Sequence, residues 1–306
     1  MATAGSRRLV VRLLIGGSLV LAACGRGAGA AQAPTALPPL HVASALIVSH
    51  PIPPLDLQAA GLTGVADLVT PFQVSSTDNN RTITLIAAYA DVARMVLIFR
   101  ESPDMGLPSA AVSDDQGLIN AGGSAGPVRS PGVRGDYYVA LDEGPHAGVD
   151  GLAHLAISVS HLTVWTPAGG SLDGNWAFNI ALNLQPGQAL PAPSQFRLGR
   201  WKVTIEKLEL TPDVVHLQAV VNGASPEMLV GPGKGAFVEL VDAAGNPVRD
   251  LGGGAGITVP KGQVNPVNYL NSRTRDEWLR PADGAYTLRF LGGGGRYEIP
   301  IIIIGS

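Results

Sequence analysis

One stretch of the sequence spells a serine-nucleophile motif, because Gly122–Gly126 reads Gly-Gly-Ser-Ala-Gly. In a hydrolase this pattern needs a strand before the serine and a helix behind it, so that the hydroxyl is presented on a strained turn beside an oxyanion hole. Pro127 and Pro131 follow the motif, and its surroundings are typical of a loop. We therefore interpret the stretch as a flexible connector and predict no catalytic residue in it.

Six histidines raise the question of a metal site. His154 and His161 are seven residues apart, so on one regular strand they would point to opposite faces and could not share an ion. The other four flank a predicted strand or stand alone: His41, His50, His146 and His216. Because zinc sites need ligand pairs at short spacing, we predict no metal ion and no other cofactor.

Two carboxyl groups about 5 to 10 Å apart across a cleft could act as the acid and base of a glycosidase. The acidic positions considered for such a pair are Asp142, Glu143, Asp150 and Asp173. Aspartates beside glycine or proline are usually turn formers. We therefore predict that the protein is not an enzyme, and an envelope hydrolase or carbohydrate-binding protein is the alternative hypothesis.

A cluster of cations around an aromatic ring indicates a possible binding surface for a protein or glycan partner. Its members are Arg273, Arg275, Trp278 and Arg280, in what we predict to be a loop. This composition is common at recognition surfaces. In the alternative interpretation, Trp278 and Leu279 close the end of a β-sandwich.

Cys24 is the single cysteine of the chain, and it follows Leu21-Ala22-Ala23. The preceding apolar run, Leu13–Ala23, is eleven residues long and begins behind three arginines. A membrane span needs about 20 residues, so this run fits the apolar core of a signal peptide instead. The segment resembles a bacterial lipoprotein signal, in which a lipobox ends on an invariant cysteine.

The lipoprotein resemblance implies that the thiol of Cys24 receives a diacylglyceryl group and that a signal peptidase cuts between Ala23 and Cys24. It places the protein on the extracytoplasmic face of the cell membrane, held by its N-terminal lipid. An ordinary secretory signal cut after Ala28-Gly29-Ala30 is the alternative. Ser6–Val10 also resembles a twin-arginine export motif.

Composition and charge favour a β protein that does not bind nucleic acid. Three of the 21 Lys and Arg residues lie in the signal, which leaves 18 against 24 Asp and Glu, a net charge of −6. This acidity argues against nucleic acid as a partner. The 39 glycines and 24 prolines suit short strands joined by many turns.

The domain organisation follows from these features. We predict a signal peptide over 1–23, a lipidated cysteine and flexible Gly/Ala/Pro tether over 24–40, a first β-sandwich with an N-terminal extension over 41–190, and a second β-sandwich over 191–306. Residues 40–48 favour a strand, which could close the first domain. Leu55–Val69 could hold one or two helical turns, with Asp56 as the cap.

An internal repeat supports a duplicated β domain. Six apolar positions match six others at a constant offset of 120: Ile83, Leu85, Ala88, Met95, Leu97 and Phe99 match Val203, Ile205, Leu208, Val215, Leu217 and Ala219. Two Asp-x-x-Gly turns, Asp114–Gly117 and Asp242–Gly245, come next. Asp173–Phe178 and Asp283–Leu288 then share the order Asp-Gly-x-aromatic-x-apolar. In this alignment, the final strand Glu298–Ile304 has no plain counterpart in the first copy.

The Asp-Gly-x-aromatic pattern resembles the turn that enters the penultimate strand of immunoglobulin-like sandwiches, where a tyrosine anchors the corner. We therefore predict an all-β chain with two tandem immunoglobulin-like β-sandwich domains. Gln73–Phe99, Gly174–Phe178 and Trp201–Val220 also resemble the tandem extracellular domains of uncharacterised, anti-sigma-factor-like, membrane-anchored bacterial proteins. We expect a non-catalytic binding, sensing or structural module, and the ectodomain of an anti-sigma-type signalling system is a further alternative.

Overall fold

The computed structural model describes residues 51–104, 106–119, 123–128, 135–164, 170–224, 237–257 and 271–305. These residues belong to one compact unit, His41–Ser306. Cys24, the predicted signal, the tether and the strand predicted over 40–48 lie outside the described residues. No helix in the described part of the chain is long and apolar enough to cross a membrane.

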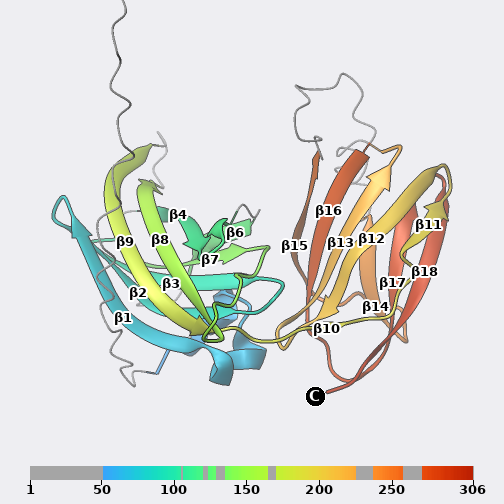
Figure 1. Ribbon diagram of the computed structural model, residues 1–306, viewed down its shortest axis with the longest axis horizontal. Coiled ribbons are helices and arrows are strands. Elements are labelled where there is room, and N and C mark those ends of the chain that lie inside the picture. Colours follow the sequence, from blue (N-terminus) through green and yellow to red (C-terminus); the bar gives the residue numbers. More distant parts are fainter. Residues whose placement is uncertain are drawn as a thin grey trace, which may run out of the picture. The chain divides into compact units, whose positions relative to one another are not determined.

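The first sandwich consists of two antiparallel sheets (Figure 1). One sheet has the order β1-β2-β3-β7-β6, with β1 at Thr70–Asp78, β2 at Arg81–Ala90, β3 at Met95–Ser102, β7 at Asp136–Leu141 and β6 at Gly123–Pro127. The other has the order β5-β4-β8-β9, with β5 at Gly117–Leu118, β4 at Leu107–Asp114, β8 at Leu152–Thr163 and β9 at Ser171–Asn183. Apolar side chains of both sheets form one buried core between them, where the rings of Phe99 and Phe178 lie 5.7 Å apart.

Strand β3 is buried on both faces, which explains its continuous apolar sequence. Met95, Leu97 and Phe99 face the sandwich core, whereas Val96 and Ile98 belong to a second cluster outside the sheet. That cluster is covered by α1 (Pro54–Ala59) and the 3₁₀ helix η1 (Thr63–Leu68). The predicted helical turns are therefore confirmed, and they shield the outer face of the sheet.

Asp56 does not cap α1, contrary to our prediction. The N-cap is Pro53, which makes no side-chain cap bond, and Asp56 lies fully buried in the first turn. Burial and then the neighbouring Asp136 raise the pKa of Asp56 to about 7. The sequence could not show this, because a strand 80 residues away supplies the second carboxyl group.

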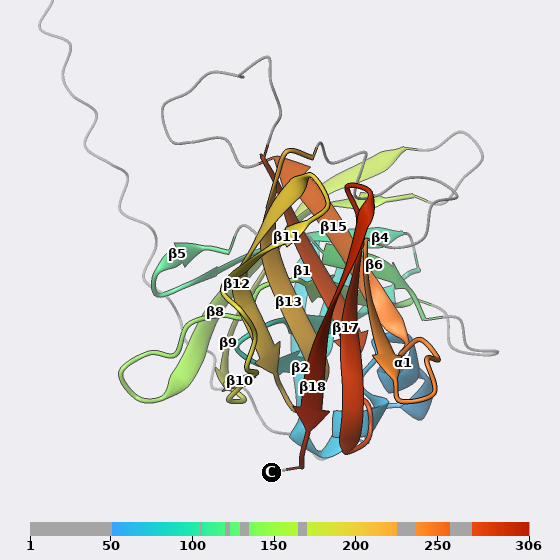
Figure 2. The ribbon, with the colours of Figure 1, turned by 90° about the vertical axis from the view of Figure 1, so that its right-hand side faces the viewer.

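The second sandwich repeats this architecture with different sheet widths (Figure 2). The wider sheet has the order β10-β12-β13-β16-β15 with β11 also paired to β12, and its strands are β10 (Gln188–Ala189), β11 (Gln195–Leu198), β12 (Trp201–Leu210), β13 (Val214–Asn222), β16 (Asn271–Leu279) and β15 (Asp250–Ile257). The narrower sheet has the order β14-β17-β18, with β14 at Val238–Asp242, β17 at Gly284–Gly292 and β18 at Gly295–Ile303. One buried cluster that includes Trp201, Leu217 and Phe290 fills the space between them.

The repeat at offset 120 is confirmed in the pairing of the strands. Leu85 pairs with Phe99 in the β2–β3 hairpin, and Ile205 pairs with Ala219 in the β12–β13 hairpin, 120 residues later on both strands. Each hairpin also carries a bulge at the same point, directly after Leu85 and Ile205. The two hairpins therefore share register as well as hydrophobic rhythm.

The two Asp-x-x-Gly turns are also equivalent, as predicted. The Oδ1 of Asp114 accepts a bond from Gln116 N at 2.8 Å, and the Oδ1 of Asp242 accepts one from Ala244 N at 2.9 Å. Gly117 and Gly245 adopt φ values of +125° and +86°. A residue with a side chain would be strained at these angles, which accounts for the glycines.

The two Asp-Gly-x-aromatic-x-apolar segments do not lie in equivalent strands, so this part of our alignment is wrong. Asp173–Phe178 lies in β9, which pairs with β8, whereas Gly284–Leu288 lies in β17, between β14 and β18. The positional counterpart of β9 is β18. The final strand therefore has a partner in the first copy, which our alignment had not found.

The predicted aromatic corner is present in the second sandwich. Tyr286 lies near the start of β17, the penultimate strand, and its hydroxyl donates to the Ala282 carbonyl oxygen at 2.9 Å. This bond back to the preceding backbone is the tyrosine corner of immunoglobulin-like domains. In the first sandwich Trp176 is fully buried instead, and its Nε1 donates to Arg81 O at 3.2 Å. The chain is thus all-β, with two tandem immunoglobulin-like sandwiches.

Candidate functional site

Three of the four residues predicted to form a binding loop belong to a strand and Arg280 directly follows it, so that prediction is wrong in its local structure. Arg273, Arg275 and Trp278 lie in β16, between β13 and β15. Trp278 is 2 % exposed and packs in the second core, as in the alternative interpretation. Arg273 and Arg275 lie on the opposite face of the strand from Trp278, because side chains alternate.

Each of these arginines is engaged separately. Arg273 pairs with Glu206 at 2.9 Å, and Arg275 pairs with Glu143 of the first sandwich at 3.5 Å. The Nη1 of Arg280 donates to the Thr211 carbonyl oxygen at 3.2 Å. The structure therefore does not gather them around one aromatic ring.

The serine of the nucleophile motif lies in a strand. Ser124 belongs to β6, where its Cα pairs with Ala140 of β7, so the stretch is not the loop we predicted. A serine nucleophile needs a turn between a strand and a helix, which β6 does not provide. The side chain nevertheless lines a pocket described below.

Three histidines each have a carboxylate partner. His146 bonds Asp114 at 2.9 Å, and His154 bonds Asp150 at 2.8 Å. His216 is buried and bonds Glu277 at 3.2 Å. We had described His146 and His216 as standing alone, and the long-range pairings correct this. Within the described ranges, no three potential metal ligands converge.

The four acidic positions weighed for a glycosidase do not come together. Asp150 forms a turn, with its Oδ1 accepting a bond from Leu152 N at 3.1 Å, and Asp173 lies in β9. Asp142 and Glu143 follow β7, and both approach residues of β16. The acidic pair that the pocket brings together is Asp142 with Glu277, a residue that we did not consider.

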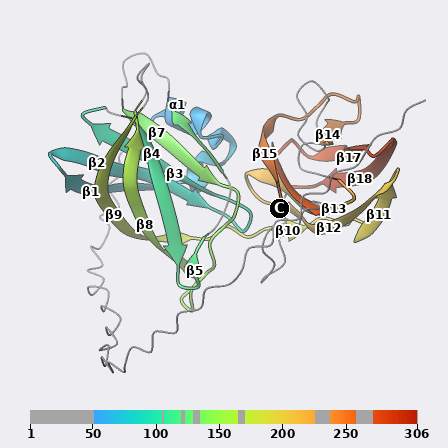
Figure 3. The same cartoon turned by 90° about the horizontal axis from the view of Figure 1, so that it is seen from above.

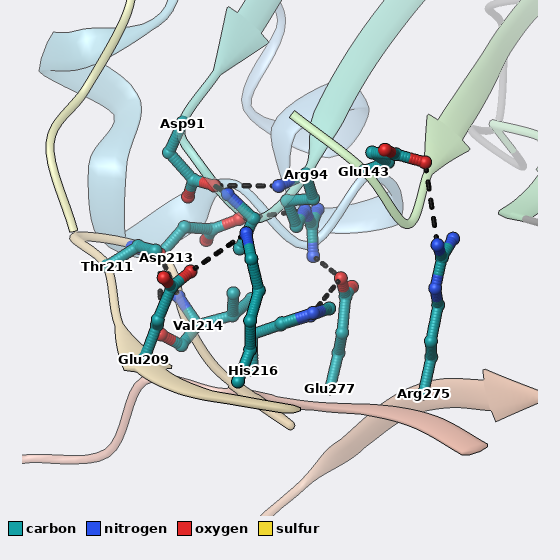
Figure 4. Close-up of polar contacts among 12 residues, drawn as sticks. Asp91, Arg94, Glu143, Glu209, Thr211, Asp213, Val214, His216, Arg275 and Glu277 are labelled. Atoms are coloured by element: carbon teal, nitrogen blue, oxygen red, sulfur yellow. Dashed lines mark hydrogen bonds and ion pairs between the residues drawn. The ribbon is translucent and has the colours of Figure 1, made fainter. Parts of the chain in front are cut away.

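The most densely charged buried place in the described structure is where the two sandwiches meet (Figures 3 and 4). We call it the joint and define it by five residues that are each at most 6 % exposed: Asp91, Arg94, Asp213, His216 and Glu277. The Nε of Arg94 lies 3.2 Å from Asp213 Oδ2, and its Nη1 lies 3.9 Å from Glu277 Oε2. The Nη2 of Arg94 donates to Ala60 O at 3.0 Å. One guanidinium therefore connects the α1 segment of the first sandwich to the β12–β13 turn and to strand β16 of the second.

The first-copy turn, Asp91–Arg94, holds Arg94 in place. The Oδ1 of Asp91 accepts bonds from Ala93 N and Arg94 N, both at 2.8 Å, and its Oδ2 accepts one from the Tyr89 hydroxyl at 2.9 Å. Asp91 N donates to Arg94 O at 2.9 Å. The aspartate thus closes the connection between β2 and β3 and aims the arginine outward from it.

The second-copy turn, Thr211–Val214, is built in the same way. The Oγ1 of Thr211 accepts bonds from Asp213 N at 3.3 Å and Val214 N at 3.0 Å, and Thr211 N donates to Val214 O at 2.9 Å. Thr211 stands 120 residues after Asp91, so equivalent turns of the two copies face each other at the joint. The segment that connects the two sandwiches is short. Gln185 N still donates to Ala90 O of the first sandwich, and Leu190 N already donates to Leu208 O of the second.

Burial shifts the titration of the carboxyls of the joint, which holds more acidic than basic groups. Burial raises the pKa of Asp213 to about 7, and the charges of Asp91 and Glu277 add to this effect while Arg94 opposes it. Burial also raises the pKa of Asp91, although four hydrogen bonds favour its ionised form. Neither oxygen of Asp213 receives a hydrogen bond of good geometry.

A pocket of about 220 Å³ opens beside Arg94. Its wall comes from α1, β6 and β7 of the first sandwich and from β15 and β16 of the second, and the lining residues are Ala59, Ala60, Gly61, Arg94, Ser124, Tyr138, Ala140, Asp142, Arg249, Asp250, Leu251 and Glu277. Asp142 is half-buried there. Burial and the charge of Glu277 raise its pKa.

Sequence reasoning missed the joint because its members lie up to 186 residues apart. One signal was available. Asp91 and Arg94 interrupt an apolar stretch between two strands, and Thr211 and Asp213 do the same at the offset of the repeat. Aligning the polar positions of the copies, in addition to the apolar ones, would have pointed to these two turns.

The chain matches no protein-family model and no curated protein sequence. Among solved structures it is similar to a conserved domain protein from Bacillus anthracis, at 12 % identity and a TM-score of 0.47, over 76 % of this chain and 89 % of that one. A marsupial T cell receptor gives 7 % identity, a TM-score of 0.21 and coverage of 74 % and 96 %. Bovine butyrophilin gives 10 % identity and a TM-score of 0.20, over 70 % of this chain and 93 % of that one. At these values the likeness carries no information on function.

Proposed function

We propose that this protein is a non-catalytic envelope lipoprotein, anchored through Cys24 on the extracytoplasmic face of the cell membrane, whose two sandwiches act together as a binding, sensing or structural module. The lipobox residues Leu21–Cys24 support the anchor. The observation that supports a common action of the two sandwiches is the buried contact of Arg94 with Asp213 and Glu277.

The buried ion pairs of the joint restrict how the two sandwiches can be arranged. A buried ion pair contributes little net stability compared with apolar packing, because desolvation of the charges offsets their attraction. It does penalise any arrangement in which one partner is left buried and alone. In our proposal the joint therefore selects one arrangement of the two sandwiches, and surfaces contributed by both are presented to a partner together.

Fractionation of cells that express the full chain tests the anchor. Cys24→Ser should lose incorporation of a labelled fatty acid and leave the membrane fraction, because the thiol is the attachment point. Gly25→Ser, at the next residue, is the matched control and should keep both. Membrane retention of Cys24→Ser at the level of the original chain would overturn the anchor proposal.

A further inference from the structure

The pocket beside the joint has the features of a small-molecule site. It lies between two domains, where ligand sites are common. Its lining is divided between apolar residues and converging polar or charged groups. Its 220 Å³ corresponds to about seven water molecules at about 30 Å³ each, which suits a ligand of fewer than about ten non-hydrogen atoms.

The charge of the wall favours a cation. Asp142 and Glu277 both line the pocket, and the one buried guanidinium there, that of Arg94, is already engaged by Asp213, Glu277 and Ala60 O. The Asp142 side chain forms no hydrogen bond with the described residues. Burial and then the charge of Glu277 raise its pKa, against the weaker opposing charges of Arg275, His216 and Arg94. A positive group beside these two carboxylates would relieve that repulsion.

An aromatic ring completes the lining. Tyr138 packs against the cluster under α1, and a Cβ at Gly126 would come within 3.1 Å of the ring, so glycine allows the ring to lie against β6. Cations bind near aromatic rings with up to about 2 kcal/mol when both are desolvated. The rim, by contrast, is exposed and of mixed charge, since it contains Arg249 and Asp250.

We propose that this pocket binds a small organic ammonium ion, with the Asp142 carboxylate facing the positive group and Tyr138 beside it. The inference rests on the binding role proposed above and gives it a ligand class. The carboxylates attract the cation, and the apolar residues Ala59, Ala140 and Leu251 accommodate its carbon atoms.

Isothermal titration of the full chain with choline tests the proposal. Choline has seven non-hydrogen atoms, and we expect saturable binding with a Kd below about 1 mM. Its uncharged carbon analogue, 3,3-dimethyl-1-butanol, should bind at least tenfold more weakly, because it has the same shape without the charge. Acetate should not bind, and Ca²⁺ should not compete with choline.

Asp142→Asn should weaken choline binding tenfold or more, whereas Asp142→Glu should retain most of it. Asp173→Asn, the same change at an exposed position of β9, is the control and should bind as the original chain does. Thermal unfolding of each variant shows whether it is folded. A folded Asp142→Asn that binds choline normally would overturn the proposal, as would equal binding of choline and its neutral analogue, preferred binding of acetate, or no heat with choline or ethanolamine at 10 mM.

These failures differ from failure of the proposed function. The envelope role is lost if Cys24→Ser stays membrane-bound, a result that does not depend on the pocket. An empty pocket would remove the ligand class and leave the anchored two-sandwich module intact.

Discussion

The first-copy turn and the second-copy turn have nearly the same backbone and opposite uses. Asp91 and Thr211 accept equivalent backbone bonds, yet the next equivalent positions differ: Ala93 corresponds to Asp213, and Arg94 corresponds to Val214. The cation thus stands on one turn and its carboxylate on the other. The two turns match in backbone, and the residues at two equivalent positions make them complementary.

We expect the largest loss of stability when a residue of one turn is replaced by its counterpart in the other turn. Arg94→Val gives the first-copy turn the residue of the second and leaves Asp213 and Glu277 buried without their cation, which should lower the free energy of unfolding by about 3 to 5 kcal/mol. Urea denaturation measures this. Adding Asp213→Ala, the residue of the first copy, should recover part of the loss. A double variant less stable than Arg94→Val alone would contradict the pairing.

The carbonyl groups of the two turns are covered differently, and Gly144→Ala tests this. A Cβ at Gly144 would lie 1.8 Å from Asp91 O, whereas the equivalent Thr211 O accepts a bond from the Arg280 side chain. The clash should cost about 2 to 3 kcal/mol, seen as a lower urea midpoint. Gly64→Ala, where a Cβ meets nothing within 4 Å, should change the midpoint little.

The burial of carboxyls at the joint predicts a pH dependence of stability, to which Asp213 of the second-copy turn contributes. The folded-state pKa of Asp213 is raised from 3.8 to about 7, so its stabilising contribution is complete below pH 3.8 and is lost as pH rises through 7. Between pH 5 and 8 the free energy of unfolding should therefore fall, by at most about 1.4 kcal/mol per pH unit from this group. Asp213→Asn should reduce that slope in urea titrations. An unchanged slope would show that other carboxyls, such as Asp56, dominate it.

The turn caps should give the smallest effect. Thr211→Ala removes the acceptor for two backbone N–H groups and should cost about 1 kcal/mol in thermal or urea unfolding. Thr211→Ser keeps the hydroxyl and should cost much less. If both variants unfold alike, the methyl group of Thr211 matters more than its hydrogen bonds.

The parts of the fold that the sequence predicted are those set by short-range pattern. The alternation around Ile83 and Leu97 predicted two strands, and the Asp-x-x-Gly spacing predicted two turns. The Asp-Gly-x-aromatic pattern misled us because it lies inside strand β9 in the first sandwich and at the start of strand β17 in the second. Only the sheet order distinguishes β9 from β17.

The candidate site was largely beyond prediction, since its geometry depends on how one sandwich meets the other. Arg275 was predicted to face a binding partner, whereas the structure pairs it with Glu143 of the other sandwich. The arginines around Trp278 led us to predict a binding loop. Because side chains alternate along β16, the Trp278 ring faces the core instead. Asp56 was read as a local cap, although its environment is set by Asp136.

The bulges after Leu85 and Ile205 have a consequence for biosynthesis. Two hairpins that share the same register and the same bulge position can exchange strands during folding. Such misassembly is characteristic of tandem-repeat proteins. The extra residue is Ile86 in one copy and Glu206 in the other, and Glu206 binds Arg273 of its own sandwich. A swapped strand would put Ile86 in the place of Glu206 and leave Arg273 without this partner, so the residue at the bulge distinguishes the two hairpins.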